Sequence, residues 1–290
     1  MNYRHAYHAG NFADVVKHVI LARIIDYLKR KEQAFRVVDT HAGIGLYDLN
    51  SVEAGKTGEW MGGIGRLLAA RRDGRISADA FDLLAPYFEA IAAVNEGETV
   101  TSYPGSPMLV RKLLRKQDRL SALELHPQDA AMLAKRFAGD FQVRVIELDG
   151  WLALGAHLPP KEKRGLVLVD PPFEVEGEFD RLVEGLAKAH KRFSGGTYAL
   201  WYPVKDRRET ERFARKLRET GIAKILQIEL AIRAPSPEPR LDGTGMIVVN
   251  PPFTLESEMK ILLPCLKDLL AEDNGANFSL RWIRSETDRS

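Results

Sequence analysis

The sequence is poor in cysteine: Cys265 is the only one among 290 residues. A single thiol excludes an internal disulfide framework and fits a reducing, cytoplasmic environment. Its apolar context, ILLPCLKDLL, indicates a buried and unreactive thiol rather than a nucleophile. Long apolar runs are absent as well, and the N-terminal segment has no apolar signal region, so we expect neither a membrane span nor export.

A strong net charge is also missing, because 42 Lys and Arg residues against 40 Asp and Glu residues leave a formal charge of +2. Total charge therefore does not indicate nucleic-acid binding, which needs local basic patches. The densest patch, residues 205–218, alternates basic with acidic side chains, which favours a solvated helix face with ion pairs over RNA contact.

Histidines are concentrated near the start of the chain, where they could suggest a metal site. Their spacing does not place several ligands on one helical turn, and three or four convergent ligands would be required. We therefore expect no metal and assign these side chains to holding the N-terminal segment and a ligand pocket together. The residues are His5, His8, His18 and His41.

Short β-rich runs alternate with helical stretches along most of the chain. This alternation predicts an α/β fold with a doubly wound, mostly parallel sheet of seven strands. Several of the runs are continuously apolar, as expected for strands covered by helices on both faces. The expected strands are 35–39, 120–124, 143–147, 165–170, 197–201, 223–230 and 245–250, and the expected helices between them are 127–138, 179–193 and 207–220.

The first two expected strands lie about eighty residues apart, whereas a βαβ unit needs only ~30. Helical periodicity within this gap, at 58–72 and 77–95, predicts a small helical lobe inserted after the first strand. We divide the chain into a main domain, residues 1–46 and 100–290, and an inserted helical subdomain, residues 47–99. A further helix is expected from Pro107, with Ser106 as its N-cap.

Ligands of open α/β sheets bind at the carboxyl ends of the strands. The first expected strand leads into DTHAGIG, residues 39–45, whose glycines let the backbone approach a ligand. Glu124 ends the second strand, where a carboxylate suits the two hydroxyls of a ribose. Asp149 and Gly150 follow the third, and Asp149 could accept from an adenine amino group. With no GxxxxGK[ST] phosphate cradle, this set fits a ribosylated adenine without phosphates, as in S-adenosylmethionine.

Asp170-Pro171-Pro172-Phe173 follows the fourth strand and is the most informative tetrapeptide. The prolines direct the backbone away from the sheet, so the Asp170 carboxylate and the Pro171 carbonyl become two acceptors facing one spot. Such a pair matches the two donors of an exocyclic amino group, and Phe173 can stack on an extruded base. A second copy, Asn250–Phe253, follows the last strand, and we interpret it as a structural turn near the site.

The glycine loop and DPPF resemble the class I, Rossmann-like N6-adenine and amino methyltransferases. The whole chain resembles the bacterial RlmJ family, the 23S ribosomal RNA adenine-N6 methyltransferases. The resemblance runs from YRHAYHAGNFADVVKH (residues 3–18) through DTHAGIG, TGEW, YPGSP, ELHP, LDG, DPPF and GTYALWYP to GMIVVNPPF. The helical insertion is also a feature of that family.

The resemblance implies roles for individual residues. Asp170 resembles the catalytic residue, with Pro171 and Phe173 beside it, and Tyr3 resembles an aromatic residue that meets the RNA, with Arg4 next to it. Phe173 stands where many members have Tyr, so stacking is retained but the phenolic hydroxyl is lost. The residues implied in S-adenosylmethionine binding are His18, His41, Ser106, Glu124, Asp149 and Gly150, with Lys17 and Asp39 close by.

We therefore expect methylation of adenine N6 in large-subunit (23S) ribosomal RNA, with S-adenosylmethionine as cofactor and a monomeric protein. The RNA could be free or part of an assembly intermediate. A DNA adenine methyltransferase would use the same chemistry, and a non-catalytic RNA-binding protein could share the fold. A small-molecule or glutamine methyltransferase fits DPPF but not the full-length resemblance.

Overall fold

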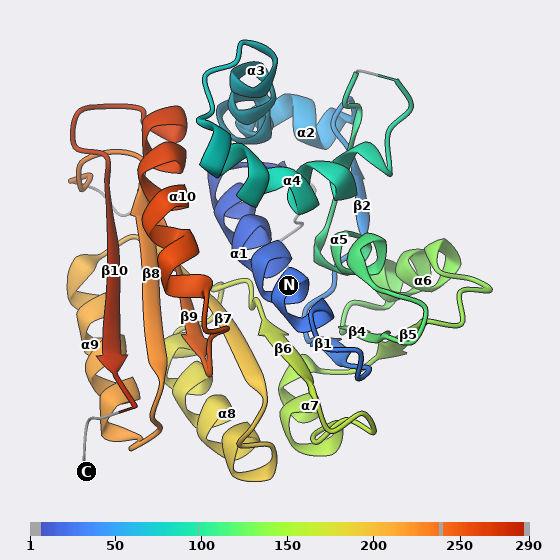
Figure 1. Ribbon diagram of the computed structural model, residues 1–290. Coiled ribbons are helices and arrows are strands. Elements are labelled where there is room, and N and C mark those ends of the chain that lie inside the picture. Colours follow the sequence, from blue (N-terminus) through green and yellow to red (C-terminus); the bar gives the residue numbers. More distant parts are fainter. Residues whose placement is uncertain (1–6, 98, 238–239, 287–290) are drawn as a thin grey trace.

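The computed structural model describes residues 7–97, 99–237 and 240–286, and an eight-stranded sheet runs through its centre (Figure 1). Its strand order is β10-β8-β9-β7-β6-β1-β4-β5. The strands are β1 (Arg36–Asp39), β4 (Arg119–Glu124), β5 (Val143–Glu147), β6 (Gly165–Val169), β7 (Thr197–Val204), β8 (Ile225–Ala231), β9 (Gly243–Val249) and β10 (Asn277–Arg284).

The five strands from β5 to β7 are paired in parallel, whereas β9, β8 and β10 each run antiparallel to the strand before them in the sheet. The expected α/β class and mostly parallel sheet are confirmed. The strand count of seven was wrong, because β10 adds an edge strand. Its sequence, NFSLRWIR, is mostly half-buried or exposed, so it lacks the apolar run by which the inner strands were recognised.

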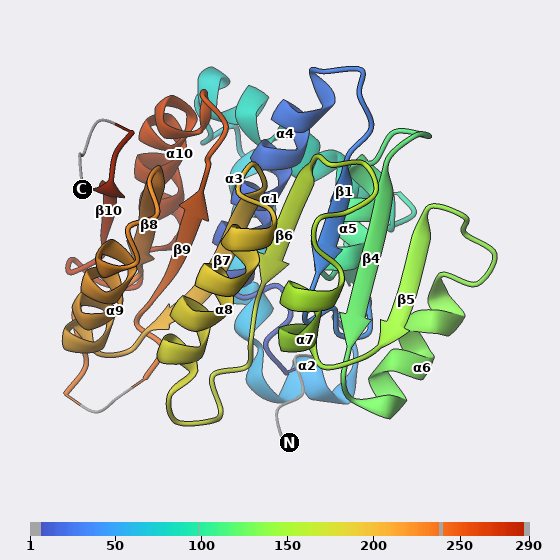
Figure 2. The same ribbon diagram turned by 90° about the horizontal axis from the view of Figure 1, so that it is seen from below.

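Helices cover both faces of the sheet (Figure 2). Alternate strand residues point to opposite faces, so Val37 joins the core under one helical layer and Val38 the core under the other. The first layer contains α1 (Phe12–Lys29), α5 (Ser106–Leu113), α6 (Pro127–Arg136) and α10 (Leu255–Leu270). The second contains α7 (Gly150–Ala156), α8 (Glu178–Arg192) and α9 (Arg207–Glu219).

The segment between β1 and β4 is largely helical, and its two ends meet in a separate antiparallel pair, β2 (Leu46–Asp48) with β3 (Ser102–Pro104). Its helices lie over α1 and α10 at the top of Figure 1. They are α2 (Val52–Thr57), the π-helical turn η2 (Met61–Gly65), α3 (Arg66–Arg72) and α4 (Ala78–Ala92). The division into a main domain and an inserted subdomain at 47–99 stays a prediction.

The second PP motif lies away from the carboxyl ends of the parallel strands. Because β9 runs antiparallel to β7, Val249 pairs with Tyr198 at the start of β7. The Asn250 side-chain amide donates to the carbonyls of Ser194 and Gly196, both at 2.8 Å. The motif is a turn, as expected. Its expected position near the site was wrong, because β9, which precedes it, runs in the opposite direction to the parallel strands.

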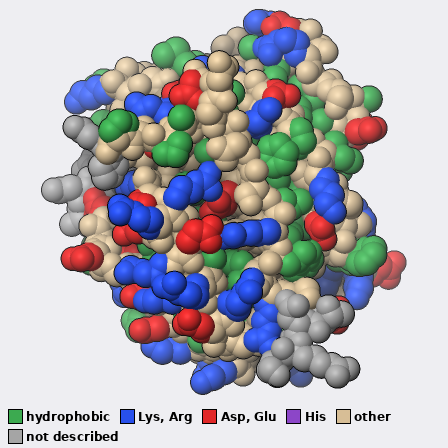
Figure 3. All heavy atoms as spheres, turned by 90° about the vertical axis from the view of Figure 1, so that its left-hand side faces the viewer, with side chains coloured by type: hydrophobic (Ala, Val, Ile, Leu, Met, Phe, Trp, Pro, Cys, Tyr) green, Lys and Arg blue, Asp and Glu red, His purple; other side chains and the backbone are tan. Residues whose placement is uncertain are grey.

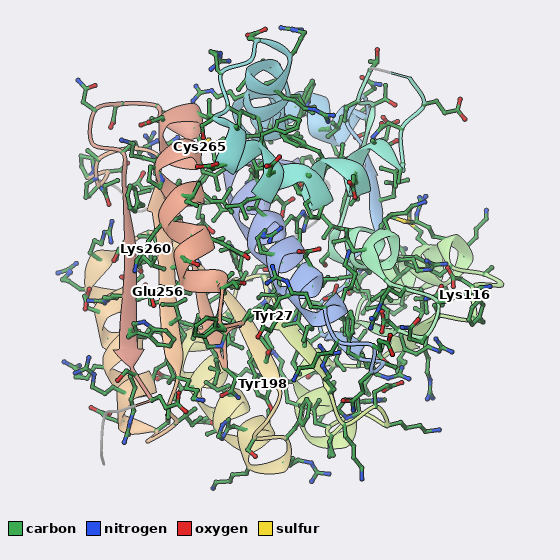
Figure 4. The ribbon with its side chains drawn as sticks, viewed as in Figure 1. Tyr27, Lys116, Tyr198, Glu256, Lys260 and Cys265 are labelled. Carbon is green, nitrogen blue, oxygen red and sulfur yellow. The ribbon has the colours of Figure 1, made fainter. Side chains whose placement is uncertain are left out.

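Two expectations about single features can be checked against the fold. Cys265 lies on α10 and is half-buried, and burial raises the pKa of its thiol (Figure 4). Basic and acidic side chains are interleaved on the face of the molecule that Figure 3 presents. Three cations of the basic segment form ion pairs, but the expectation of pairs within the segment is confirmed for Arg208 only, because the other two pair with carboxylates of β8 and α8. These pairs are Arg207–Glu229, Arg208–Asp206 and Lys216–Asp180.

No described helix has the length and apolarity that a membrane span requires.

Candidate active site

A cleft of about 340 Å³ opens where β1, β4, β5, β6 and β7 end. Sites for small molecules typically enclose roughly 300–1,000 Å³. The site residues predicted from the sequence that line it are Lys17, His41, Ser106, Glu124, Asp149, Gly150, Asp170, Pro171 and Phe173. Tyr3 and Arg4 lie outside the described residues. The structure thus gathers residues from six separate segments around one space.

Two further predicted residues are buried beside the cleft rather than in its lining. His18 is fully buried, and its Nδ1 lies 2.8 Å from the Tyr103 hydroxyl, which in turn lies 3.0 Å from the Tyr87 hydroxyl. Asp39 is fully buried behind Ser106. Asp39 therefore reaches the cleft through Ser106, whereas the hydroxyl partners of His18 are themselves buried and do not line it. A direct ligand contact for either residue stays a prediction.

Glu124 holds the loops on two sides of the cleft. Its Oε2 accepts from the backbone N–H of Gly43 and its Oε1 from that of His126, both at 2.8 Å. Gly43 has a φ of 59°, a conformation that glycine adopts without strain. Each carboxylate oxygen can accept a second hydrogen bond, so Glu124 stays available to a pair of hydroxyls.

His41 is neutral near pH 7, because burial lowers the pKa of its imidazole to about 4. The Thr40 hydroxyl donates its only hydrogen to the Leu168 carbonyl at 3.0 Å. It therefore accepts from His41 Nδ1, which lies 2.8 Å away. This assignment leaves His41 Nε2 as an acceptor at the cleft.

Asp149 is the N-cap of α7 and accepts from the backbone N–H of Trp151 at 2.9 Å. Its other oxygen lies 3.3 Å from Arg181, whose guanidinium lies 4.7 Å from the centre of the Trp151 ring. At Gly150 a Cβ would fall 2.0 Å from the Thr40 carbonyl oxygen, so only glycine fits. Trp151 and Arg181 line this part of the cleft, and the sequence interpretation missed both.

Asp39 and Ser106 form a buried hydrogen bond under the cleft, in which the Ser106 hydroxyl donates to Asp39 at 2.7 Å. Burial raises the pKa of the Asp39 carboxyl to about 7, although the bond from Ser106 opposes the shift. The expected N-cap role of Ser106 was wrong. Gly105 is the N-cap of α5, and Ser106 is the first helical residue, because its hydroxyl is used by Asp39.

Asp170 is paired with a buried lysine that the sequence interpretation had placed only near the cofactor. Lys17 Nζ lies 2.5 Å from Asp170 Oδ2 and 2.8 Å from Asp14 Oδ1. Burial lowers the pKa of the Lys17 ammonium, but the two carboxylates outweigh burial and raise it well above its ordinary value. Lys17 is therefore a permanent cation that holds one oxygen of Asp170. Within the described chain, Asp170 Oδ1 has no hydrogen-bond partner.

Phe173 is held in a backbone conformation that is uncommon for a side-chain-bearing residue, with a φ of 52°. Such a conformation costs on the order of 1–3 kcal/mol and persists only where the surroundings impose it. Here the ring packs edge-on against Phe179 at 4.9 Å and against Trp201 at 5.7 Å. The DPPF turn therefore places Asp170, Pro171 and the Phe173 ring together at the cleft.

Asp14, Trp201 and Lys205 also line the cleft, although the sequence interpretation assigned none of them to the site. Trp201 belongs to the block GTYALWYP and ends the strand expected at 197–201, so its position at a strand end was a signal that could have found it. Asp14 carried no such signal, and Lys205 was noted only as part of the basic patch at 205–218. Among the described side chains, no group of three or more His, Cys, Asp or Glu residues could hold a metal ion.

Comparisons with known proteins agree with this geometry. Residues 32–284 match the family model described as Ribosomal RNA large subunit methyltransferase D, RlmJ. The chain is 44% identical to Ribosomal RNA large subunit methyltransferase J of Haemophilus influenzae and 42% identical to that of Escherichia coli. Each match covers 99% of this chain and 100% of the relative.

A solved structure has the same fold along nearly the whole chain. The crystal structure of a Legionella pneumophila protein superposes with a TM-score of 0.86 at 36% identity, covering 95% of this chain and 98% of that one. Similarity of this extent covers both the sheet and the helical insertion. The chain therefore belongs to the RlmJ family of ribosomal RNA large subunit methyltransferases.

Proposed function

We propose that this protein transfers a methyl group from S-adenosylmethionine to N6 of an adenine in large-subunit (23S) ribosomal RNA. Membership of the RlmJ family supports the methyltransferase class and the RNA. The observation that carries the choice of atom is the DPPF turn. It presents a carboxylate oxygen without a partner in the described structure, beside an aromatic ring, in a cleft with further carboxylates at the strand ends.

The residues of the β1, β4 and β5 ends suit S-adenosylmethionine. Glu124 can accept from both ribose hydroxyls, and Asp149 from the amino group of the adenine moiety. Trp151 offers an apolar wall, and the neutral His41 offers an acceptor. When bound, S-adenosylmethionine supplies an electrophilic methyl group on a positively charged sulfur.

The lone pair of an adenine amino group is delocalised into the ring, so N6 is a poor nucleophile and must be activated. In the proposed reaction Asp170 provides this activation. Asp170 Oδ1 and the Pro171 carbonyl accept from the two N6 hydrogens. They orient N6 and favour its change towards tetrahedral geometry. Lys17 donates to Asp170 Oδ2 and so holds the carboxylate in this orientation. The N6 proton then leaves to Asp170 or to water.

The test is methyl transfer from labelled S-adenosylmethionine to deproteinised ribosomal RNA from a strain that lacks this gene, followed by nucleoside analysis. We expect label in N6-methyladenosine from large-subunit RNA. Replacing Asp170 with Ala should abolish turnover and leave cofactor affinity largely intact in a calorimetric titration. Comparable turnover of this variant would refute the role of Asp170.

A DNA adenine methyltransferase remains the second candidate, because the DPPF turn does not distinguish DNA from RNA. Parallel reactions with double-stranded DNA, ribosomal RNA and ribosomal assembly particles separate the candidates. Label in DNA alone would retain the chemistry and overturn the RNA assignment. Label in particles alone would retain the RNA and make an assembly intermediate the substrate.

A further inference from the structure

The cleft extends beyond the residues assigned to the cofactor. Because β7 lies on the opposite side of β6 from β1 and β4, residues at the end of β7 lie past Asp170 as seen from Gly43 and Glu124. This half of the cleft is lined by Trp201, Pro203, Lys205 and Leu241, with His8 and Asn11 from the start of the chain. None of these six residues has a role in the proposed transfer.

Two aromatic rings form a corner beside Asp170. The rings of Phe173 and Trp201 lie 5.7 Å apart at 77°, and Lys17 Nζ lies 5.9 Å from the centre of the Trp201 ring. Trp201 is fixed in this orientation, because its indole N–H donates to Thr244 Oγ1 at 2.8 Å. A planar base that lies flat on one ring meets the other ring with its edge. Such a corner fits a base whose amino group reaches Asp170.

Lys205 provides an uncompensated positive charge at the mouth of this corner. Its neighbours Arg207 and Arg208 are each balanced by a carboxylate, Glu229 at 2.9 Å and Asp206 at 2.8 Å. Lys205 is exposed and forms no ion pair with any carboxylate in the described part of the chain. A lysine that forms no ion pair in the described part of the chain, in the same half of the cleft as the two aromatic rings, is suited to bind a phosphate of an extruded nucleotide.

We propose that Trp201 forms one wall of the pocket for the target base and that Lys205 binds a phosphate of the target strand. The inference rests on the proposed function and adds its recognition of the nucleic acid. It makes Lys205 a determinant of RNA affinity and Trp201 a determinant of base placement. Neither residue contributes to cofactor binding.

The test of Lys205 is a titration of the protein with large-subunit ribosomal RNA at several salt concentrations between about 50 and 200 mM. Lys205→Gln should reduce the slope of log Kd against log salt by about one, because one phosphate contact is lost. It should also raise KM for RNA without changing kcat. The matched control is Lys188→Gln on α8, which removes the same charge from a residue that is 75% exposed and paired with Glu184.

An unchanged salt slope and KM in Lys205→Gln would overturn the phosphate contact. So would an equal effect of Lys188→Gln, since that result would reflect total charge alone. A competition assay adds a second measurement. Adenosine monophosphate should inhibit the wild type more strongly than adenosine does, and Lys205→Gln should remove this difference.

The test of Trp201 compares Trp201→Phe with Trp201→Leu. Loss of the ring should raise KM for RNA between about 5-fold and 100-fold, as expected for one base contact, whereas the smaller ring of Phe should restore most of the affinity. The Kd for S-adenosylmethionine should stay unchanged in both variants. Equal KM values for Phe, Leu and Trp would overturn the base wall.

Failure of this inference can be told apart from failure of the proposed function. A wild-type protein that transfers no methyl group to adenine contradicts the proposed function. The RNA titration needs no turnover, so the salt slope still decides whether Lys205 binds phosphate. An active wild type with unaffected Lys205 and Trp201 variants refutes the inference alone.

Discussion

Lys17 lies between the carboxylates of Asp14 and Asp170 and is only 4% exposed. A buried cation is tolerated because two anions surround it, and the same contacts hold Asp170 in place. Asp14 is itself fixed, since its other oxygen accepts from the Gly10 backbone N–H at 2.9 Å. The reactive carboxylate is therefore positioned from the start of α1, 153 residues away in the sequence.

Removing the cation should disturb both stability and catalysis. Lys17→Met leaves Asp14 and Asp170 without their partner, and we expect the free energy of unfolding to fall by about 3–5 kcal/mol. Urea denaturation measures this change, and turnover should fall with it because Asp170 loses its orientation. Lys188→Met is the control, since an exposed pair on α8 contributes at most about 1 kcal/mol. If Lys17→Met and Lys188→Met lowered the free energy of unfolding equally, the two buried ion pairs of Lys17 would contribute no more to stability than an exposed pair.

The buried Asp39 carboxyl should make stability depend on pH. Its folded pKa of about 7 lies above its ordinary value of 3.8, so folding favours the protonated form. This contribution is fully present below about pH 4 and is lost as pH rises through 7. Asp39→Asn keeps an acceptor for Ser106 and removes the titration. The variant should therefore gain stability relative to the wild type between pH 4 and 7, by up to roughly 4 kcal/mol.

The measurement for Asp39 is the free energy of unfolding of both proteins at several pH values in that window. A constant difference between them would show that Asp39 is already ionised in the folded protein. If the stability advantage of Asp39→Asn became smaller as the pH rises, the pKa of Asp39 would be lowered by folding rather than raised. Either result would contradict the effect of burial on this carboxyl.

At the scale of elements, the helical insertion holds the beginning of α1. Glu59 accepts from the Asn11 side chain at 3.0 Å and lies 3.0 Å from His8 Nδ1. This hydrogen bond raises the pKa of the His8 imidazole. The π-helical turn η2 also lies directly against the chain here, and the Ile64 backbone N–H donates to the Gly10 carbonyl at 2.8 Å. The insertion thus positions the helix that carries Asp14 and Lys17.

Gly63 is the tightest point of this contact. A Cβ there would lie 2.2 Å from the Gly10 carbonyl oxygen, whereas a Cβ at Gly62 in the same turn would meet nothing within 4 Å. We expect Gly63→Ala to lower the free energy of unfolding by about 2 kcal/mol or more, and Gly62→Ala to change it by less than about 0.5 kcal/mol. Methyl transfer should fall in Gly63→Ala alone, because the start of α1 is displaced.

Thermal denaturation and initial-rate measurements on the two glycine variants check this expectation. Full activity of Gly63→Ala would show that the insertion does not position α1. Helix propensity cannot produce such a loss, because Ala favours a helical turn over Gly. A loss in Gly62→Ala as large as that in Gly63→Ala would therefore contradict a specific contact between Gly63 and Gly10.

At the scale of the whole molecule, the insertion and the sheet share one hydrophobic core. Leu67 of α3 and Leu84 of α4 belong to the same buried cluster as Ile20 of α1 and Leu263 of α10. Arg66 also donates to the carbonyls of Leu270 and Ala271 at the end of α10, at 3.0 and 2.7 Å. Elements with a common core unfold together.

We therefore expect the insertion and the main domain to unfold in one transition. Trp60 lies in the insertion and can report on it by fluorescence once Trp151, Trp201 and Trp282 are replaced by Phe. The urea midpoint from Trp60 should coincide with the midpoint from far-ultraviolet circular dichroism, which follows the whole chain. An earlier midpoint for Trp60 would show that the insertion unfolds by itself.

The sequence alone determined the class of fold and much of the site, because those signals are local. The apolar runs that became β1, β4 and β6 must be covered on both faces, and strands that alternate with helices form parallel pairs. The carboxyl ends of such strands share one edge, so Glu124, Asp149 and Asp170 could be grouped before any coordinates existed. The DPPF turn was recognisable because prolines restrict the backbone wherever they occur.

Tertiary structure decided the features that depend on contacts between distant segments. The edge strand β10 has no apolar run, and only its pairing with β8 defines it. The reversal of β9 moved Asn250–Phe253 away from the site, and Asp39 drew Ser106 from its expected capping role. The family resemblance placed Lys17 near the cofactor and the basic patch contained Lys205, but nothing in the sequence indicated the contacts of these residues or of Asp14. Their significance arises from burial, or from the absence of a neighbouring carboxylate in the described structure, and a one-dimensional pattern carries neither.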